Sequence, residues 1–388
     1  MEKEKPLVNV TYTTNTGFER SIRSVPAGVR ELLGVMGERG RKLLPEDVVR
    51  NAKNVVITGC GDSLCAAYAS EGAFEEFTDL RVDTPTCIDL GRHYSPRKFG
   101  APGETIAMVI STSGMVSRCA EAALRARRNG AVTVAVTANA ESSLAQSCDY
   151  ILDVTLTEFW SERAPGSRNY VGSALAVQMF AAELGVIRGC ITEAERDDFY
   201  AEIARYNEEW DKAIPALFDR IAPLAPVWNE APYYEALGSG PEFPAAWFTQ
   251  AKVFEGINNF ARYENFEDWM HVDYFLRKMD TAIILYCASN NPALSRARET
   301  ETTLTTQGYK YLFVTDADPG TFNQPDKIVQ IPGSKYAFLN GVFEGLVGCI
   351  MFDGIQKIRG NGYYCSDLID GPFKFGNNFL RNSKIEEV

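Results

Sequence analysis

The sequence predicts an α/β protein made of two successive units, each a parallel sheet covered by helices on both faces. Three observations indicate this class: short runs that are apolar at almost every position, helical patterns between those runs, and a return of the same order in the second half of the chain. Strands of continuous apolar character are typical of parallel sheets buried on both sides. The 388 residues suffice for two domains of ordinary size.

The first unit begins at about residue 50. Strands are predicted over residues 54–58, 82–90, 105–111, 132–137 and 150–154. Helices are predicted over residues 63–77, 117–129 and 170–185, and the last of these closes the unit.

The second unit repeats the order. Its strands are predicted over residues 233–237, 282–288, 311–315 and 327–331, with helices over residues 292–307 and 337–357. We divide the chain into a helical lead-in (1–45), a first domain (46–200), a helical connector (201–224), a second domain (225–360) and a tail (361–388).

Composition narrows the possible partners. The 39 basic and 51 acidic residues give a net charge of −12, which argues against nucleic acid or an anionic membrane as partner. The N-terminal residues lead into no apolar signal core, and the apolar stretch 336–355 is interrupted by Asn340, Glu344 and Asp353. We therefore expect a cytoplasmic protein.

The nine cysteines are odd in number and contain no Cys-x-x-Cys pair. This pattern predicts free thiols in a reducing compartment and neither a disulfide framework nor a zinc site. With only His93 and His271 available as imidazole ligands, we expect no metal and no organic cofactor.

A hydroxyl-rich loop, Ser-Thr-Ser-Gly-Met-Val-Ser at residues 111–117, follows a predicted strand and precedes a predicted helix. Backbone N–H groups, hydroxyls and the positive end of a helix dipole suit a phosphate monoester at such a place. Helix capping by Ser113 or Ser117 is the alternative interpretation. The run Gly-Cys-Gly-Asp-Ser at residues 59–63 has the same placement and is also consistent with a tight turn.

The corresponding loop of the second half reads Ser-Asn-Asn-Pro at residues 289–292 and lacks the run of hydroxyls. We therefore expect one phosphate site per chain, in the first half.

Together, the runs at residues 59–63 and 111–117 resemble the SIS (sugar isomerase) domain. The doubled arrangement, over about residues 45–385, resembles the isomerase half of glucosamine-6-phosphate synthase and its relatives, which include fructosamine-6-phosphate deglycases. The resemblance implies two tandem SIS domains, each a three-layer αβα sandwich. It also implies phosphate binding by the loop residues Gly61, Ser63, Ser111, Ser113 and Ser117.

The same resemblance points to a Lys-x-x-Glu segment, here Lys252 and Glu255, with His271 sixteen residues beyond the glutamate. It implies that Glu255 moves a proton between C1 and C2 and that Lys252 lies near a substrate oxygen or amine. His271, from a neighbouring subunit, would open the sugar ring. Residues three apart share one helix face, and enolisation needs both a carboxylate and a cation or donor. A surface ion pair is the alternative interpretation.

Some positions depart from the family pattern. Val272 follows His271 where many relatives have Gly-Pro, and Val116 stands at a usually polar position of the phosphate loop, so that Ser117 would have to substitute. Arg168 stands in the place of a family lysine, and Arg381 is the nearest equivalent of a lysine in the C-terminal tail. Both arginines are possible substrate contacts.

The resemblance implies an aldose–ketose isomerase of a sugar 6-phosphate or amino-sugar phosphate, assembled as a homodimer or larger even oligomer. Cleavage of a C–N bond in a fructosamine 6-phosphate is an alternative, because the same enolisation can expel an amine. A non-catalytic phosphosugar sensor is the third possibility.

Overall fold

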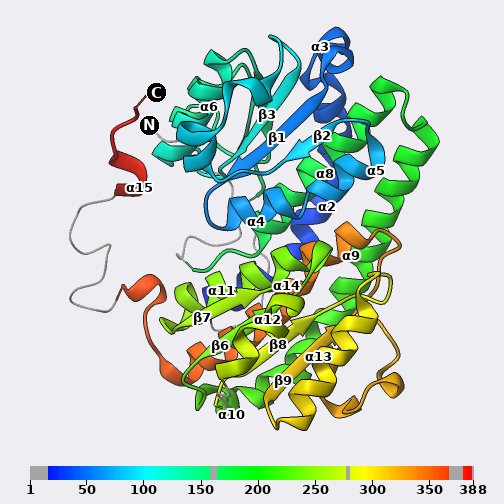
Figure 1. Ribbon diagram of the computed structural model, residues 1–388, viewed down its shortest axis with the longest axis vertical. Coiled ribbons are helices and arrows are strands. Elements are labelled where there is room, and N and C mark those ends of the chain that lie inside the picture. The colour runs from blue at the N-terminus through cyan, green and yellow to red at the C-terminus, as the bar shows by residue number, and fades with distance from the viewer. Residues whose placement is uncertain (1–15, 158–163, 277–279, 367–378, 387–388) are drawn as a thin grey trace.

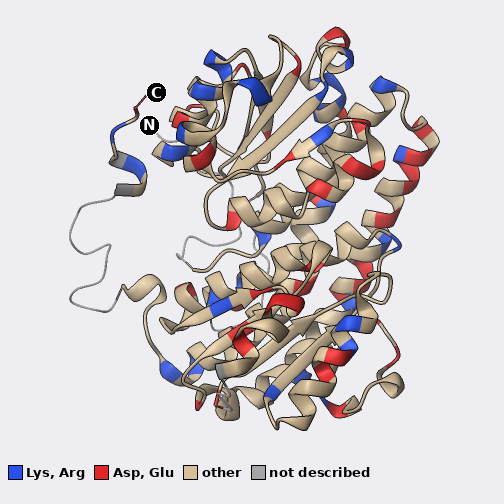
Figure 2. Ribbon diagram, viewed as in Figure 1, with Lys and Arg blue, Asp and Glu red and all other residues tan. Residues whose placement is uncertain are grey.

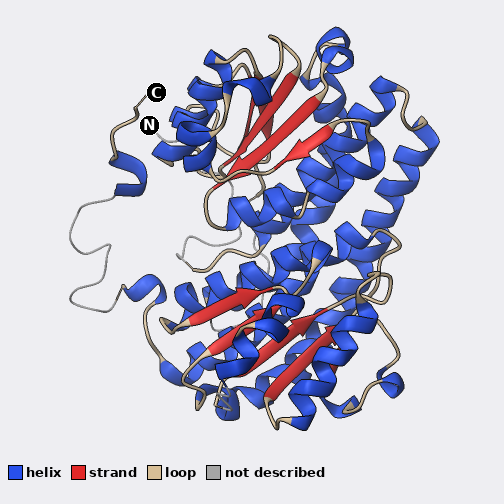
Figure 3. Cartoon of the chain, viewed as in Figure 1, coloured by secondary structure: helices blue, strands red, loops and turns tan. Residues whose placement is uncertain are grey.

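The computed structural model describes residues 16–157, 164–276, 280–366 and 379–386. Two domains, each with one five-stranded sheet, lie one above the other along the long axis of the molecule (Figures 1 and 3). Helices cover both faces of each sheet, and charged residues lie mostly on the outer helices and loops (Figure 2). The predicted α/β class is confirmed.

The first sheet has the strand order β2-β1-β3-β4-β5, with every neighbouring pair parallel. Its strands are β1 (Asn54–Gly59), β2 (Arg81–Asp83), β3 (Thr105–Ile110), β4 (Val132–Thr137) and β5 (Tyr150–Asp153). The chain order reverses between β1 and β3, and open α/β sheets bind ligands at such a place, beyond the carboxyl ends of the strands.

The second sheet has the order β10-β9-β8-β6-β7 and is also parallel throughout. Its strands are β6 (Tyr234–Leu237), β7 (Ala261–Glu264), β8 (Ala282–Tyr286), β9 (Lys310–Thr315) and β10 (Ile328–Gln330). When the second sheet is listed from its other edge, as β7-β6-β8-β9-β10, its strands follow the same order along the chain as those of the first sheet. The two halves are therefore copies of one fold, as the repeated sequence order predicts.

The helices run between and around the strands. They are α1 (Gly17–Arg23), α2 (Val25–Leu43), α3 (Glu46–Asn51), α4 (Asp62–Tyr68), α5 (Glu71–Phe77), α6 (Ser117–Arg128), α7 (Ser143–Ser147), α8 (Arg168–Arg188), α9 (Glu193–Ile221), α10 (Ala225–Asn229), α11 (Phe243–Ile257), α12 (Phe266–His271), α13 (Leu294–Thr306), α14 (Ala337–Arg359) and α15 (Phe379–Asn382). The described part of the lead-in is helical; residues 1–15, and residues 367–378 and 387–388 of the tail, lie outside the described ranges.

Three predicted elements differ clearly from the structure, and the short strand β7 was not predicted. The helix predicted over residues 63–77 is two helices, because the chain turns at Ser70, whose hydroxyl donates to the Ala66 carbonyl at 2.7 Å. The strand predicted over residues 82–90 ends at Asp83, since Pro85 has no N–H to continue the ladder. α9 begins at Glu193, within the predicted first domain, where Thr192 and Glu195 form a capping box.

α8 and α14 are long and apolar enough to cross a membrane by length and composition. Within the protein, 89% and 100% of their apolar windows are buried. Both therefore serve as core helices, α8 in the first domain and α14 in the second.

The contact of α14 with the 3-10 turn Gly240–Glu242, just before α11, generates a stability prediction. A Cβ atom added at Gly341 would lie 1.8 Å from the Pro241 carbonyl oxygen, so the backbone would have to move. We expect Gly341→Ala to lower the free energy of unfolding by about 1–3 kcal/mol, the usual cost of overpacking. The matched control is Gly34→Ala in α2, where no heavy atom lies within 4 Å. It should be neutral or stabilise by up to about 1 kcal/mol. Urea denaturation of both variants measures the difference, and equal midpoints would contradict the packing described.

Candidate functional site

A pocket of about 350 Å³ lies beyond the carboxyl ends of β1 and β3. This is the point in the first sheet where the strand order reverses. The lining residues come from the loops after the two strands, from the start of α8 and from the C-terminal region: Cys60, Asp62, Ser63, Ile110, Ser111, Thr112, Ser113, Val116, Cys119, Ala164, Gly166, Asn169, Tyr170, Ser173, Tyr364 and Arg381.

A larger cavity, of about 640 Å³, lies at the opposite edge of the same sheet, beside Asn54 and Arg81 at the amino ends of β1 and β2. None of the predicted site residues lines it. We place the candidate site in the smaller pocket because ligands of parallel sheets collect at the carboxyl ends of the strands.

The predicted phosphate loop, residues 111–117, is fixed by hydrogen bonds from the segment that follows β4. The carbonyl oxygens of Thr112 and Gly114 accept backbone N–H groups of Ala138 and Leu144, each at 3.0 Å. Gly114 has φ +64°, and a Cβ atom there would lie 2.0 Å from the Ser142 hydroxyl. Carbonyl oxygens that would repel an anion are thus engaged away from the pocket, while Ser111 and Ser113 line it.

Gly61 and Ser63 occupy the second loop of the pocket. Gly61 has φ +60° and precedes α4, a backbone conformation that favours glycine. Ser63 lies in the first turn of α4 and lines the pocket beside Asp62. The structure therefore brings the two predicted phosphate-binding loops together.

Ser117 has a different role from the other loop serines. Its buried hydroxyl donates to the backbone carbonyl of Arg381 at 2.9 Å, and it is not among the residues that line the pocket. The next residue, Arg118, donates to Ser383 at 3.1 Å. The tail thus docks on the start of α6, beside which α15 lies in Figure 1, and brings Arg381 to the pocket as the sequence suggested.

Lys252 joins the second domain to this pocket. Its side chain is fully buried in α11, and its Nζ atom lies 2.6 Å from Asp62 and 2.5 Å from Glu255. The same ammonium group lies 4.5 Å from the centre of the Phe248 ring. Burial alone would lower the pKa of Lys252, but the two carboxylates outweigh burial and raise that pKa above its ordinary value.

The alternative interpretation of Lys252 and Glu255 as a surface pair is therefore wrong. Lys252 has no exposed side chain, whereas about a quarter of the side chains of Asp62 and Glu255 is exposed. Asp62 lines the pocket, and Lys252 pairs with both Asp62 and Glu255. Through Lys252, the predicted phosphate-binding loops of the first domain are therefore connected to a carboxylate of the second domain.

His271 does not join these residues within one chain. It is the last residue of α12 and is 67% exposed, with Nε2 2.9 Å from a carboxylate oxygen of Glu267. Glu267 also pairs with Arg296 at 2.5 Å. His271 is not among the residues that line the pocket.

Arg168 is likewise not among the lining residues. Its buried guanidinium donates to the Thr157 carbonyl, and its side-chain carbons lie against Gly28, where an added Cβ atom would approach them to 2.9 Å. Arg168 therefore contributes to the packing of α2 against α8. Its neighbours Asn169 and Tyr170 face the pocket instead.

The equivalent loop of the second domain is surrounded by carboxylates. The N–H and hydroxyl of Ser289 both donate to Asp316, at 2.5 and 2.6 Å, and Ala288 donates to the buried Glu242 at 3.2 Å. Burial, and then the charges of Glu242 and Asp316, raise the pKa of the fully buried Glu344 well above its ordinary value. Asp316 already accepts both donors of Ser289 and carries a negative charge, so this end of the sheet disfavours a phosphate.

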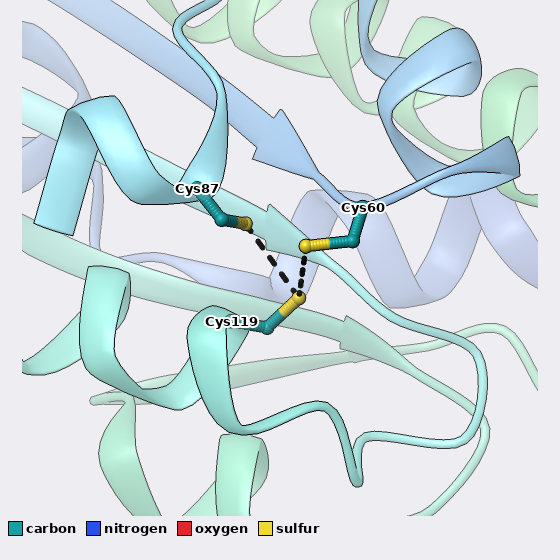
Figure 4. Close-up of side chains that lie close together, drawn as sticks. All are labelled: Cys60, Cys87 and Cys119. Atoms are coloured by element: carbon teal, nitrogen blue, oxygen red, sulfur yellow. Dashed lines mark hydrogen bonds between the residues drawn. The ribbon is translucent and has the colours of Figure 1, made fainter. Parts of the chain in front are cut away.

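Cysteines form a part of the site that sequence reasoning missed. Cys60, Cys87 and Cys119 converge from three segments that follow β1, β2 and β3, with Sγ distances of 3.8 Å between Cys60 and Cys119 and 3.6 Å between Cys87 and Cys119 (Figure 4). Hydrogen bonds from Cys119 and Cys87 lower the pKa of the Cys60 thiol. The sequence did contain one indication that these cysteines could meet. Each of them follows a strand whose carboxyl end lies at this edge of the sheet.

Residues 49–159 match the SIS domain family. A region of the chain is 23% identical over 236 residues to an isomerizing glutamine–fructose-6-phosphate aminotransferase of Corynebacterium diphtheriae. That region covers 59% of this chain and 37% of the relative. An Arabidopsis thaliana protein of the same name is 33% identical over 98 residues, which are 25% of this chain and 14% of the relative. The chain thus matches well under half of the length of these relatives.

The fold is shared over nearly the whole chain. The C-terminal domain of glucosamine-fructose-6-phosphate aminotransferase from Francisella tularensis superposes with a TM-score of 0.76, covering 90% of this chain and 98% of that one, at 14% identity. Glucosamine-6-phosphate deaminase from Thermotoga maritima gives a TM-score of 0.62 at 17% identity, covering 90% and 96%. The chain contains a SIS domain, and its second half repeats the strand order of that domain.

These arrangements predict where phosphate binds. Ser113→Ala should weaken phosphosugar binding about 10- to 100-fold, the loss expected for a hydrogen bond to a charged group. Ser289→Ala, at the equivalent loop of the second domain, is the matched control and should leave binding unchanged. Isothermal titration measures both constants. A sugar phosphate found in crystals with its phosphate beside residues 289–291 would contradict the assignment.

Proposed function

We propose that the protein is an isomerase that interconverts the aldose and ketose forms of a sugar 6-phosphate or amino-sugar phosphate. The observation that carries this proposal is the buried Lys252, which pairs both with Glu255 and with Asp62, a residue that lines the phosphate pocket. The SIS domain at residues 49–159 and the isomerizing aminotransferases among the relatives support the substrate class.

The phosphate is the anchor of the substrate. Ser63, Ser111 and Ser113 supply hydroxyl donors from the first domain, and the pocket of about 350 Å³ has room for a monosaccharide phosphate. With the phosphate at these loops, we expect the carbon chain to extend past Asp62 toward α11. C1 and C2 would then come close to the Glu255 carboxylate.

Glu255 is the proposed acid and base. Its carboxylate takes the proton from C2 of the open-chain aldose, the C–H electron pair forms the C1–C2 double bond, and the carbonyl electrons move onto O1. Return of the proton to C1, with transfer of the O2 hydrogen to O1, gives the ketose.

Lys252 acts through its neighbours. Its ammonium group bonds to both carboxylates and is fully buried, so it holds Glu255 in place and stabilises the negative charge of the base. We therefore assign Lys252 a positioning role in place of the substrate contact suggested by the family resemblance.

His271 is proposed to complete the site of a second chain, where it would open the sugar ring. Its imidazole is exposed, and the residues that follow it include the exposed apolar side chains Val272 and Phe275. Exposed side chains of this size support an interface between subunits. A homodimer or larger even oligomer is the assembly that this role requires.

The central residue yields a kinetic prediction. Glu255→Gln keeps the shape of the side chain and removes the base, so we expect turnover to fall about 10²- to 10⁴-fold. Phosphosugar affinity should stay nearly unchanged, because the serine loops supply most of the binding. Glu209→Gln, which alters a glutamate paired with Arg205 at 2.7 Å on the surface, is the control and should be fully active.

The assay uses a panel of sugar phosphates, amino-sugar phosphates and glycated-amine phosphates, and it measures both ketose and free amine. Near-normal turnover of Glu255→Gln would reduce Glu255 to an ion-pair partner of Lys252. Release of amine without formation of an isomerised sugar would favour C–N cleavage over isomerisation.

The shared site predicts complementation between chains. Glu255→Gln and His271→Asn chains should each be slow alone. A hybrid oligomer purified by two different tags should recover part of the wild-type activity, because one of its sites contains both native residues. A hybrid no faster than its parents, or a fully active monomer in sedimentation, would contradict the role of His271 across subunits.

A further inference from the structure

The three cysteines of Figure 4 have the spacing of ligands around one metal ion. Their Sγ atoms all lie within 4.8 Å of one another, and the two recorded contacts are 3.6 and 3.8 Å. An ion held tetrahedrally at about 2.3 Å from each sulfur places its ligand sulfurs about 3.8 Å apart. A disulfide would instead need two of these sulfurs to close to about 2.05 Å.

The surroundings favour a thiolate at Cys60, while hydrogen bonds to the neighbouring thiols and burial raise the pKa of Cys119, whose proton a metal ion would displace on binding. Cys119 lies in the first turn of the 12-residue helix α6, at the positive end of the helix dipole, which stabilises a negative sulfur. Arg118 is its neighbour in sequence and adds a positive charge close to Cys60. The cluster sits against the apolar residues Val56 and Val109, which exclude water from its far side.

One side of the cluster is accessible. Cys60 is partly exposed and lines the phosphate pocket together with Cys119, whereas Cys87 is buried behind them. The pocket therefore offers an entry path for an ion, and it leaves a fourth coordination position open toward the bound ligand. Such an open position is typical of metal sites that contact a substrate or water.

We propose that Cys60, Cys87 and Cys119 bind one thiophilic d¹⁰ metal ion, Zn²⁺ or Cu(I), at the wall of the phosphosugar pocket. Soft thiolate sulfurs select these ions over Mg²⁺ or Ca²⁺. The site is independent of the isomerase chemistry, which runs through Glu255. It also departs from the sequence-based expectation of no metal, because residues separated by 27 and 32 positions meet only in the fold.

The test uses the reduced 388-residue chain under anaerobic conditions. Co²⁺, a spectroscopic substitute for Zn²⁺, should bind one ion per chain with a sulfur-to-cobalt charge-transfer band that Zn²⁺ abolishes. A parallel titration with Cu(I) shows which of the two ions is held more tightly. Zn²⁺ should also raise the melting temperature, since an ion that binds only the folded state stabilises it.

Cys119→Ser and Cys60→Ser should each lose the band and the thermal shift. Because Cys60 is partly exposed and Cys119 is buried, Cys60→Ser should perturb folding less than Cys119→Ser. Cys60→Ser therefore tests metal binding even if Cys119→Ser is less stable. Cys148→Ser is the matched control, since Cys148 packs against the same apolar cluster without belonging to the sulfur group, and it should bind the ion normally.

Absence of the band and of the thermal shift in the wild-type chain, together with no binding of Cu(I) at one ion per chain, would overturn the proposal. Equal binding by Cys60→Ser, Cys119→Ser and the wild type would overturn it as well. A disulfide between two of these cysteines after mild oxidation, found by mass spectrometry in a chain that binds no ion, would show a redox pair in place of a metal site.

Discussion

A single buried cation ties the two domains to one site. Lys252 belongs to the second domain and has no exposed surface, and one of its two carboxylate partners, Asp62, lies in the first domain. A buried ammonium is costly unless it is paired, so Asp62 and Glu255 must both stay within reach for this packing to be stable. The same buried ammonium group therefore fixes both the docking of the two domains and the position of Glu255.

The two copies of the fold have divided the chemistry between them. The first keeps a hydroxyl-rich loop whose carbonyls are engaged on the side of β4, which leaves Ser111 and Ser113 for an anion. The second has carboxylates at the equivalent place, where Asp316 already binds Ser289. It contributes instead the helix α11, whose Lys252 pairs with Asp62 at the pocket of the first domain and with Glu255. In the proposed function, one copy of the fold binds the phosphate and the other supplies the reacting residues.

Much of this could be predicted from the sequence, because buried parallel strands are apolar throughout and repeat in the same order. β7 could not, since its four residues, Ala-Arg-Tyr-Glu, form an edge strand without that signature. The burial of Lys252 was also hidden: a Lys-x-x-Glu pattern is the same on a surface helix, and the deciding partner, Asp62, is 190 residues away in the chain. The cysteine cluster and the packing role of Arg168 likewise depend on contacts between distant segments.

The central claim is that Glu255, held by Lys252 at the phosphate pocket, moves a proton between adjacent carbons of a phosphosugar. Incubation of the enzyme with its substrate in D₂O, followed by NMR of C1 and C2, tests this most directly. The account predicts deuterium at the carbon that receives the proton with the wild-type chain, and almost none with Glu255→Gln at the same substrate occupancy. Undiminished deuterium incorporation by Glu255→Gln would contradict it.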